Sequence, residues 1–353
     1  MKNLEKYLTL LGEEVDGLLL TSRYSRHYGA EFDIAEGVAI VAKAGCRYFT
    51  DSRYIESAQN GIKGFEVICV DKIGYNKLLN DAIADFGITT LGYEENYLTV
   101  AEWMGYQDNL KAKLVPFTNK IYGFRACKEE WELELMRKAQ SIADKAFTEV
   151  LPRIKVGMTE LELQAELIYC LYKNGGQGLS FDPIVVSGPN SSMPHGVAGE
   201  RKIQEGDFIT MDFGVLYHGY CSDMTRTVAV GYATEEMKKV YDTVLQAQLA
   251  GIAVTKAGVP GKDIDGAARK VITDAGYGEY FGHGYGHSLG LEVHESPSPN
   301  GRNPEPMPEN AVTSAEPGIY LPGKFGVRIE DVVILKQDGC ENITHSPKNL
   351  IIV

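Results

Sequence analysis

The sequence lacks several features that would direct a protein to a membrane or an oxidising compartment. None of its apolar runs approaches the roughly 20 residues of a membrane span, and no signal-peptide segment is visible at the N-terminus. The six cysteines are scattered without a C-x-x-C pair, which indicates free thiols rather than disulfides or a zinc ribbon. We therefore expect a cytoplasmic protein that has no membrane partner.

Basic residues are also fewer than acidic ones. The 353 residues include 35 Lys and Arg against 48 Asp and Glu, a formal net charge of −13. This balance argues against a nucleic-acid partner, because nucleic acids are bound by basic surfaces. It leaves carboxylates available for hard divalent cations. The length allows one or two domains, and the 44% hydrophobic content is ample for a large core.

The first third of the chain alternates short helical and strand patterns. Residues 38–41 and 47–50 are β-rich runs separated by a short turn, which predicts a hairpin. Helices and strands that alternate in this way favour a three-layer α/β domain. A polar segment from residue 118 to 130 ends the pattern, so we expect one domain at 1–122 and a second at 123–353. Further helices are expected at 55–60 and 75–86, and further strands at 65–70 and 90–93.

The second domain contains an internal repeat. Two pairs of amphipathic helices are predicted, and glycines mark equivalent points in each pair. Gly258 follows Gly157 by 101 residues, and Gly276 follows Gly175 by the same interval. We expect a duplicated unit in which four helices cover one face of an antiparallel sheet, an α+β architecture.

Histidine is scarce, and its distribution is uneven. Of the seven histidines, His283, His287 and His294 lie within the 14 residues from Gly282 to Glu295. The glycines of this segment allow its backbone to approach another part of the protein closely. Because imidazole is a common metal ligand and proton carrier, the cluster indicates a functional site.

Charged or imidazole side chains interrupt five stretches that otherwise resemble core β-strands. A buried carboxylate is costly unless it is paired, hydrogen-bonded or bound to a metal. Four carboxylates and one imidazole embedded in this way predict a metal centre. The five residues are Asp212, Asp223, His287, Glu316 and Glu330.

These five stretches, in this order, resemble the pita-bread metallopeptidases, which include prolidase, aminopeptidase P and methionine aminopeptidase. The resemblance covers residues 125–353, while the segment 49–54 (FTDSRY) gives residues 1–120 a resemblance to the creatinase/prolidase-type N-terminal domain. That domain, with the motifs at 194–196 (PHG) and 326–331 (GVRIED), points to the proline-specific branch. The resemblance implies a homodimeric peptidase that cleaves the Xaa-Pro bond of dipeptides or short peptides and releases the N-terminal residue.

The resemblance also implies a ligand set for two divalent ions. Asp212 would hold one ion, Asp223 and Glu330 would bridge the two, and His287 and Glu316 would complete the second site. Carboxylate-rich ligation with one imidazole suits Mn²⁺, and Co²⁺ or Zn²⁺ could substitute. Glu316 could in addition take the proton of the attacking water and pass it to the leaving nitrogen.

Three more histidines match residues on the substrate side of the family. The resemblance implies that His283 and His294 contact the peptide carbonyl or the tetrahedral gem-diolate, and that His195 lines the pocket beside the proline. Donors directed at developing oxyanion charge are a large catalytic term.

Two neighbours of the expected ligands are also candidates. Arg328 lies two residues before Glu330 on the same strand face, and it either binds a substrate carboxylate or pairs structurally with an acid such as Asp212. Thr225 lies two residues after Asp223, where its hydroxyl could support a ligand.

Two other functions remain open at this point. A methionine aminopeptidase-like enzyme would share the five ligands, although the large N-terminal domain weighs against it. A metal-free relative, either creatinase-like or a binding module, would be expected to have lost ligands, whereas this chain keeps all five. The sequence does not distinguish a strict dipeptidase from an aminopeptidase that accepts longer peptides.

Overall fold

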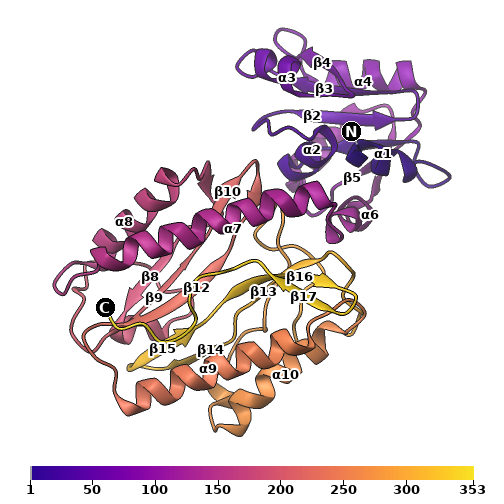
Figure 1. Cartoon of the computed structure of the whole chain (residues 1–353). Helices are drawn as coiled ribbons and strands as arrows, with labels where there is room; N and C mark the ends of the chain where they lie inside the picture. The colour runs from indigo at the N-terminus through magenta and orange to yellow at the C-terminus, as the bar shows by residue number, and fades with distance from the viewer. Residues whose placement is uncertain (1) are drawn as a thin grey trace. The chain divides into compact units, whose positions relative to one another are not determined.

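The computed structural model describes residues 2–353 (Figure 1). The chain divides into two compact units after Arg125, and the second unit is Ala126–Val353. Each unit has its own sheets and its own buried core. Within the described residues, every helix is too short or too polar to cross a membrane.

The N-terminal unit is built on one six-stranded mixed sheet with the strand order β4-β3-β2-β1-β5-β6. The expected hairpin is present, because β2 and β3 pair antiparallel. β1 pairs antiparallel with β2 and parallel with β5 on its other side. The strands are β1 (Gly17–Leu20), β2 (Val38–Ala42), β3 (Gly45–Thr50), β4 (Glu66–Cys69), β5 (Thr90–Tyr93) and β6 (Lys113–Pro116).

In the described part of this unit, six helices accompany the sheet, which confirms the expected α/β architecture. One of them, α6, occupies part of the segment that the sequence suggested as a polar connection. It forms because Thr118 and Ile121 are buried and because Glu95 accepts hydrogen bonds from the backbone and hydroxyl of Thr118. The helices are α1 (Lys2–Thr9), α2 (Arg23–Ala30), α3 (Ile55–Gly61), α4 (Tyr75–Phe86), α5 (Val100–Asn109) and α6 (Thr118–Gly123).

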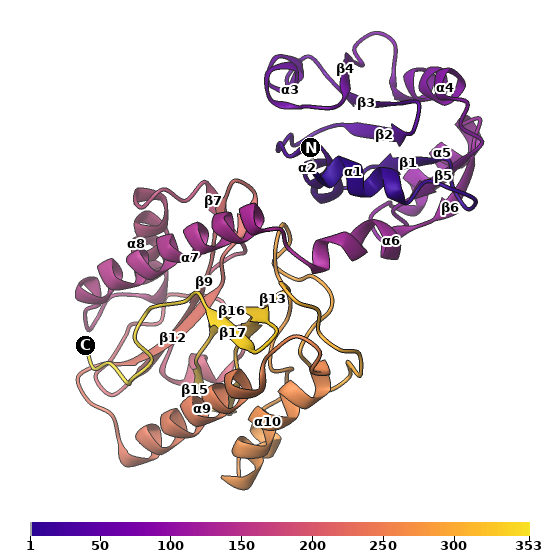
Figure 2. The ribbon, with the colours of Figure 1, turned by 45° about the vertical axis from the view of Figure 1, so that its right-hand side comes forward.

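The C-terminal unit combines two helix pairs with short antiparallel sheets. α7 packs on α8 and α9 on α10, and strands run between the pairs in the views of Figures 1 and 2. The helices are α7 (Glu130–Val150), α8 (Glu160–Lys173), α9 (Glu235–Val254) and α10 (Gly261–Asp274).

The strands of this unit form four small sheets with the orders β12-β9-β8, β13-β16-β17, β11-β10-β7 and β14-β15. The first two sheets carry most of the candidate site. The strands are β7 (Gly178–Leu179), β8 (Ile184–Ser187), β9 (Phe208–Phe213), β10 (Val215–Tyr217), β11 (Tyr220–Cys221), β12 (Met224–Ala229), β13 (Val312–Ala315), β14 (Gly318–Leu321), β15 (Phe325–Arg328), β16 (Asp331–Lys336) and β17 (Gly339–Asn342).

The predicted duplication is visible in the backbone and in the core. Gly157 and Gly258 have φ values of 90° and 83°, and Gly175 and Gly276 have values of 102° and 87°. These left-handed positions flank α8 in one half and α10 in the other, and they favour glycine because it has no Cβ. Each half also has its own apolar core, one around α7 and α8 and one around α9 and α10.

On α9 the apolar pattern of the sequence does not match the buried face at every position. Leu249 shares the helical spacing of the apolar residues, which predicts burial, but it is 40% exposed. The buried face instead includes Gln248 and Gly251. A Cβ on Gly251 would lie 2.2 Å from the ring of Tyr285, so this aromatic side chain packs directly on the helix backbone. The helix therefore turns a slightly different face inward than its leucines alone indicate.

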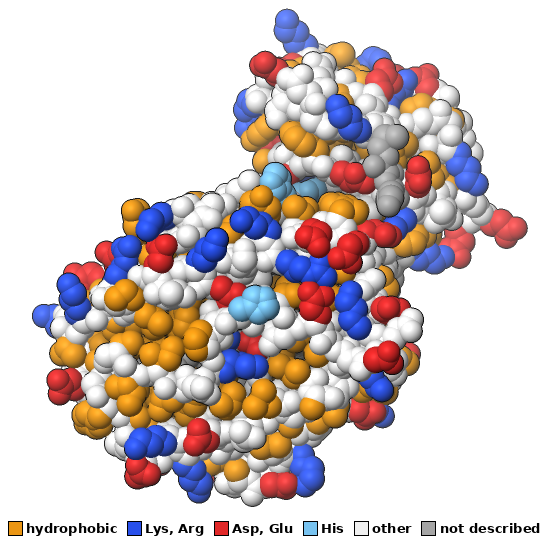
Figure 3. All heavy atoms as spheres, viewed as in Figure 1, with side chains coloured by type: hydrophobic (Ala, Val, Ile, Leu, Met, Phe, Trp, Pro, Cys, Tyr) orange, Lys and Arg blue, Asp and Glu red, His pale blue; other side chains and the backbone are white. Residues whose placement is uncertain are grey.

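The surface of the C-terminal unit is mixed in character. On the face shown in Figure 3, lysines and arginines are interspersed with acidic side chains, and hydrophobic side chains gather near the C-terminus. Tyr232 and Ile352 are exposed. They lie close together because Gly231 donates a backbone hydrogen bond to Val353.

Candidate active site

A cavity of about 610 Å³ opens in the C-terminal unit. All of the residues that the sequence analysis proposed as ligands, catalytic groups or substrate contacts line it. They are His195, Asp212, Asp223, His283, His287, His294, Glu316, Arg328 and Glu330.

Each of the four acidic residues lies within a β-strand or directly beside one. Asp212 lies within β9, and Asp223 lies between β11 and β12. Glu316 follows β13 directly, and Glu330 lies between β15 and β16. Strands β9 and β12 pair so that Asp212 is opposite Thr225, and the backbone of Glu330 donates to the Thr225 carbonyl. Strand pairing therefore brings carboxylates from distant parts of the chain to one place.

The segment that carries His287 differs from the expectation of a β-like stretch. It makes only isolated bridges, one of them between Ser288 and Thr313. Its backbone lies against β13 so closely that a Cβ on Gly286 would be 2.2 Å from the Ser314 carbonyl oxygen. The hydroxyl of Ser314 accepts a hydrogen bond from the His287 amide and donates one to Glu316. Glycine at position 286 thus allows this backbone to approach β13 closely, and the segment is not a regular strand.

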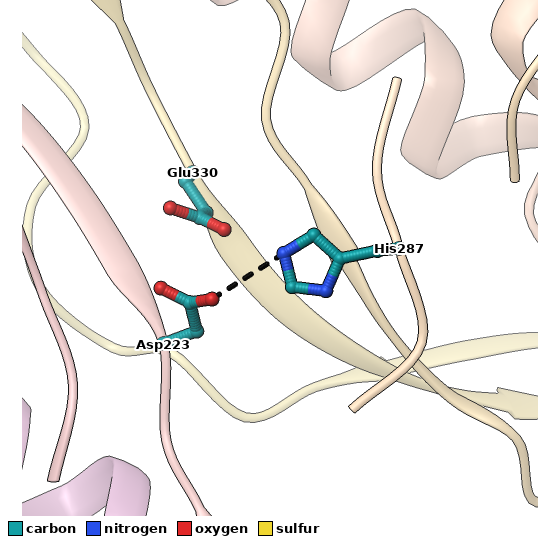
Figure 4. A group of neighbouring side chains, drawn as sticks. All are labelled: Asp223, His287 and Glu330. Atoms are coloured by element: carbon teal, nitrogen blue, oxygen red, sulfur yellow. Dashed lines mark ion pairs between the residues drawn. The ribbon is translucent and has the colours of Figure 1, made fainter. Parts of the chain in front are cut away.

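Three of the side chains form a compact group that could hold a metal ion. The ligand atoms of Asp223, His287 and Glu330 all lie within 4.8 Å of one another, and Figure 4 shows the three side chains converging. Nε2 of His287 lies 3.4 Å from Asp223 Oδ2 and 3.3 Å from Glu316 Oε1. Asp212 Oδ2 lies 2.5 Å from Nη2 of Arg328.

Burial dominates the electrostatics of this group. It raises the pKa of Asp223 to about 7 and also raises the pKa values of Asp212 and Glu330. Burial lowers the pKa of His287, but the Asp223 and Glu316 carboxylates outweigh it and bring the value to about 9. So many acids in one buried place are costly unless positive charge compensates them.

The donor atoms fit a divalent cation. Among the described residues, one buried oxygen each of Asp212, Asp223 and Glu330 has no hydrogen-bond partner. Nδ1 of His287 lies 3.2 Å from the Ser288 carbonyl and donates to it, so Nε2 is the ring nitrogen that faces the carboxylates and would give up its proton to bind a metal. Unpartnered carboxylate oxygens beside an imidazole nitrogen are ligands that suit a divalent metal.

Supporting hydrogen bonds hold two of these carboxylate residues in place. The Thr225 hydroxyl donates to Glu330 Oε2 over 2.7 Å, as the sequence spacing suggested. The buried side chain of Gln140 on α7 accepts a hydrogen bond from the Asp223 amide over 3.2 Å. Gln140 was missed by the sequence analysis, because its contact joins positions 83 residues apart.

Arg328 links the acidic group to one of the histidines. Its Nη2 bonds Asp212, and its Nη1 donates to the Tyr320 hydroxyl over 2.8 Å. Nδ1 of His283 lies 2.9 Å from the Gly284 carbonyl, so Nε2 accepts from the Tyr320 hydroxyl. The pairing of Arg328 with Asp212 is thus present, while its binding of a substrate carboxylate stays a prediction.

Tyr320 was also missed, although a signal for it exists. Tyr320 and Gly318 share one face of β14 by the alternation of a strand. A Cβ on Gly318 would lie 2.4 Å from the Tyr320 hydroxyl, so the glycine leaves room for that hydroxyl. Because both ring nitrogens of His283 are occupied, a contact between His283 and a peptide carbonyl requires Tyr320 to release it.

The other two histidines line the same cavity. The ring of His294 packs edge-on against His287 with 4.3 Å between centroids. Burial and the charge of His287 lower the pKa of His294, so its imidazole is neutral near pH 7. His195 is exposed to the cavity, and among the described residues no group hydrogen-bonds its imidazole.

The fold and site define a metallopeptidase. Residues 134–337 match metallopeptidase family M24, and residues 2–127 match the creatinase/prolidase N-terminal domain. The chain belongs to metallopeptidase family M24, with a creatinase/prolidase N-terminal domain followed by a pita-bread domain. It is therefore a hydrolase whose family uses divalent metal ions.

Relatives of known sequence or structure extend this assignment over the whole chain. An uncharacterized peptidase of Bacillus subtilis is 41% identical over 99% of both proteins. An Xaa-Pro dipeptidase from Bacillus anthracis has a TM-score of 0.96 at 40% identity, covering 100% of this chain and 99% of that one. An X-Pro aminopeptidase from Thermotoga maritima has a TM-score of 0.94 at 38% identity, covering 99% of both chains.

Proposed function

We propose that this protein hydrolyses the Xaa-Pro bond of dipeptides or short peptides and releases the N-terminal residue. The observation that carries the proposal is the convergence of three unpartnered, buried carboxylate oxygens with His287 Nε2 in one cavity. We further propose that Asp212, Asp223, His287, Glu316 and Glu330 hold two divalent ions. A set of four carboxylates and one imidazole suits Mn²⁺, and Co²⁺ or Zn²⁺ could substitute.

The chemistry follows from this ligand set. Divalent ions, when bound, lower the pKa of a coordinated water and so supply a nucleophile at neutral pH. Glu316 would accept the proton of that water and deliver it to the leaving nitrogen. Its Oε1 accepts a 2.9 Å hydrogen bond from Ser314, which fixes the orientation of the carboxylate for this transfer.

Two histidines are suited to the substrate side of the reaction. His294 is neutral and lies against His287, so a ring N–H can donate to the carbonyl oxygen as charge develops on it. His195 would contact the proline end of the substrate. His283, held by Tyr320, would act on the carbonyl only after that hydrogen bond opens.

Support for proline comes from the relatives and from the cavity wall. Both structural relatives described above carry Xaa-Pro or X-Pro names. The cavity wall includes Phe181, Pro183, Ile184, Val197 and Val293, which can pack against an apolar ring. A prolyl amide has no N–H, so a site built for it needs no acceptor at the scissile nitrogen.

Paired dipeptides test this proposal. An Xaa-Ala substrate would bury an N–H donor without a partner and would lose contacts to the ring, so we expect kcat/KM for Xaa-Pro to be about 100- to 1000-fold higher at equal manganese loading. Comparable values would contradict the proline specificity. Cleavage of Met-Ala but not Met-Pro would instead indicate a methionine aminopeptidase-like enzyme. An Xaa-Pro tripeptide assayed alongside separates a dipeptidase from an aminopeptidase.

A further inference from the structure

A buried carboxylate outside the metal centre fastens the loop that carries His195. Glu160 is the first residue of α8, and it is fully buried. Its Oε1 accepts hydrogen bonds from the backbone and the hydroxyl of Ser187 over 2.7 and 2.8 Å. Its Oε2 accepts one from the Gly199 amide over 3.1 Å. Asn190 donates its side-chain amide to both oxygens, over 3.1 and 3.2 Å.

All of these donors belong to the segment around His195. Ser187 and Asn190 lie before His195 in the chain, and Gly199 lies after it. The carboxylate therefore joins the two ends of the loop. Backbone hydrogen bonds from Glu160 to Arg201 and from Leu161 to Gly199 hold the loop end against α8 in addition.

Capping of α8 does not account for this carboxylate. The helix already has a complete capping box, in which the Thr159 hydroxyl accepts from the Glu162 amide over 3.1 Å and Glu162 accepts from the Thr159 amide over 2.7 Å. Glu160 is therefore not needed to cap α8. A buried carboxylate is costly unless it is hydrogen-bonded, and the hydrogen bonds from the loop offset that cost.

The middle of the loop is held against β15, the strand that precedes Glu330. The Gly326 amide on β15 donates to the Ser191 hydroxyl, and a Cβ on Gly326 would lie 2.1 Å from the Ser191 carbonyl oxygen. Nη1 of Arg328 lies 3.3 Å from the Pro194 carbonyl. With no hydrogen bond on its own imidazole among the described residues, His195 depends on the loop backbone for its position.

We propose that Glu160 is a positioning residue that holds His195 at the cavity for peptide hydrolysis. This inference rests on the substrate-side role of His195 in the proposed function. A glutamine at position 160 would keep the shape of the side chain but present an NH₂ group to donors such as the Gly199 amide. One end of the loop would then be released, and a displacement of even about 1 Å at a catalytic group can cost about 100-fold in rate.

A double-mutant cycle in the manganese-loaded, full-length protein tests the proposal. We expect Glu160→Gln to lower kcat/KM for an Xaa-Pro dipeptide about 10- to 100-fold in the wild-type background. In a His195→Ala background the same substitution should change kcat/KM less than about 3-fold, because Glu160 acts through His195. Metal content should stay as in the wild type. An equal loss in both backgrounds, or no loss in either, overturns the proposal.

A matched control and a milder variant accompany the cycle. Glu166→Gln makes the same chemical change on the exposed side of α8, where Glu166 pairs with Arg153, and it should leave kcat/KM unchanged. Asn190→Ala removes two contacts to the carboxylate without altering the helix, and it should give a smaller loss that also disappears in His195→Ala. If Glu160→Gln does not fold, the cycle with Asn190→Ala decides alone.

Amide hydrogen exchange tests the same inference without any activity. In Glu160→Gln, exchange in residues 188–199 should be at least about 10-fold faster, while the segment 283–295 exchanges as in the wild type. Unchanged exchange in 188–199 overturns the proposal. If the wild type cleaves no Xaa-Pro peptide, the proposed function fails, and this measurement still decides whether Glu160 holds the loop.

Discussion

The hydroxyl of Thr225 donates a 2.7 Å hydrogen bond to Oε2 of Glu330, and Oε1 of the same carboxylate is buried without a hydrogen-bond partner among the described residues. One oxygen is thus oriented by the protein while the other remains available for a ligand. Groups that orient metal ligands typically contribute 10- to 100-fold to metal affinity. The pair Thr225 and Glu330 therefore links the sheet to the candidate metal centre.

We predict that Thr225→Val weakens manganese binding about 10- to 100-fold, because valine cannot orient Glu330. Thr210→Val is the matched control, since Thr210 is equally buried in the adjacent strand but its hydroxyl pairs with that of Thr227. Manganese titration of metal-free protein measures both. Equal affinities of the two variants would show that the hydrogen bond to Glu330 has no influence on the metal.

His294→Ala should keep the metal and lose turnover. The ring lies against His287 but is not among the proposed ligands, and loss of one donor to a developing oxyanion typically lowers kcat about 10²–10³-fold. His345→Ala, at an exposed histidine, serves as the control. Steady-state kinetics and metal analysis of the same preparations check the prediction. Loss of metal from His294→Ala would place it among the ligands instead.

Arg226→Met should destabilise the fold. Its guanidinium is buried and bonds Asp331 over 2.7 Å, as well as the carbonyls of Thr225 and Ser346. Removing one partner of a buried ion pair leaves an uncompensated charge, but Lys348 also contacts Asp331, so we expect a loss of about 3 kcal/mol in the free energy of unfolding.

Denaturant unfolding measures this loss, and Arg137→Met is the control. Arg137 pairs with Glu341 at the surface, where such a pair contributes about 0–1 kcal/mol. Similar losses in the two variants would mean that the burial of Arg226 adds nothing to its contribution.

The elements that the sequence predicted are those with a local physical cause. The hairpin of β2 and β3 follows from two β-rich runs and a short turn. α8, one of the helices expected in pairs, begins at a local signal, the capping box of Thr159 and Glu162. Gly157 and Gly258 mark equivalent turns in the two halves, so the same local signal occurs twice. Both glycines have a left-handed backbone. Polar residues in apolar strands likewise identified side chains that line one cavity.

The features that the sequence did not predict depend on contacts between distant segments. Gln140 supports Asp223 across 83 residues, and Tyr320 lies between Arg328 and His283 only after β14 and β15 have paired. The segment around His287 resembles a strand in its composition, but its position is set by the close approach of Gly286 to Ser314. The local periodicity of the sequence does not reveal these contacts between distant segments.

The most direct test of the central claim, a two-metal site formed by five side chains, is elemental analysis of the manganese-loaded protein. We predict two ions per chain in the wild type and in Asp338→Ala, an exposed acid in the turn before β17, and clearly fewer in Asp223→Ala. Fewer than two ions in the wild type, or an undiminished content in Asp223→Ala, would contradict the claim.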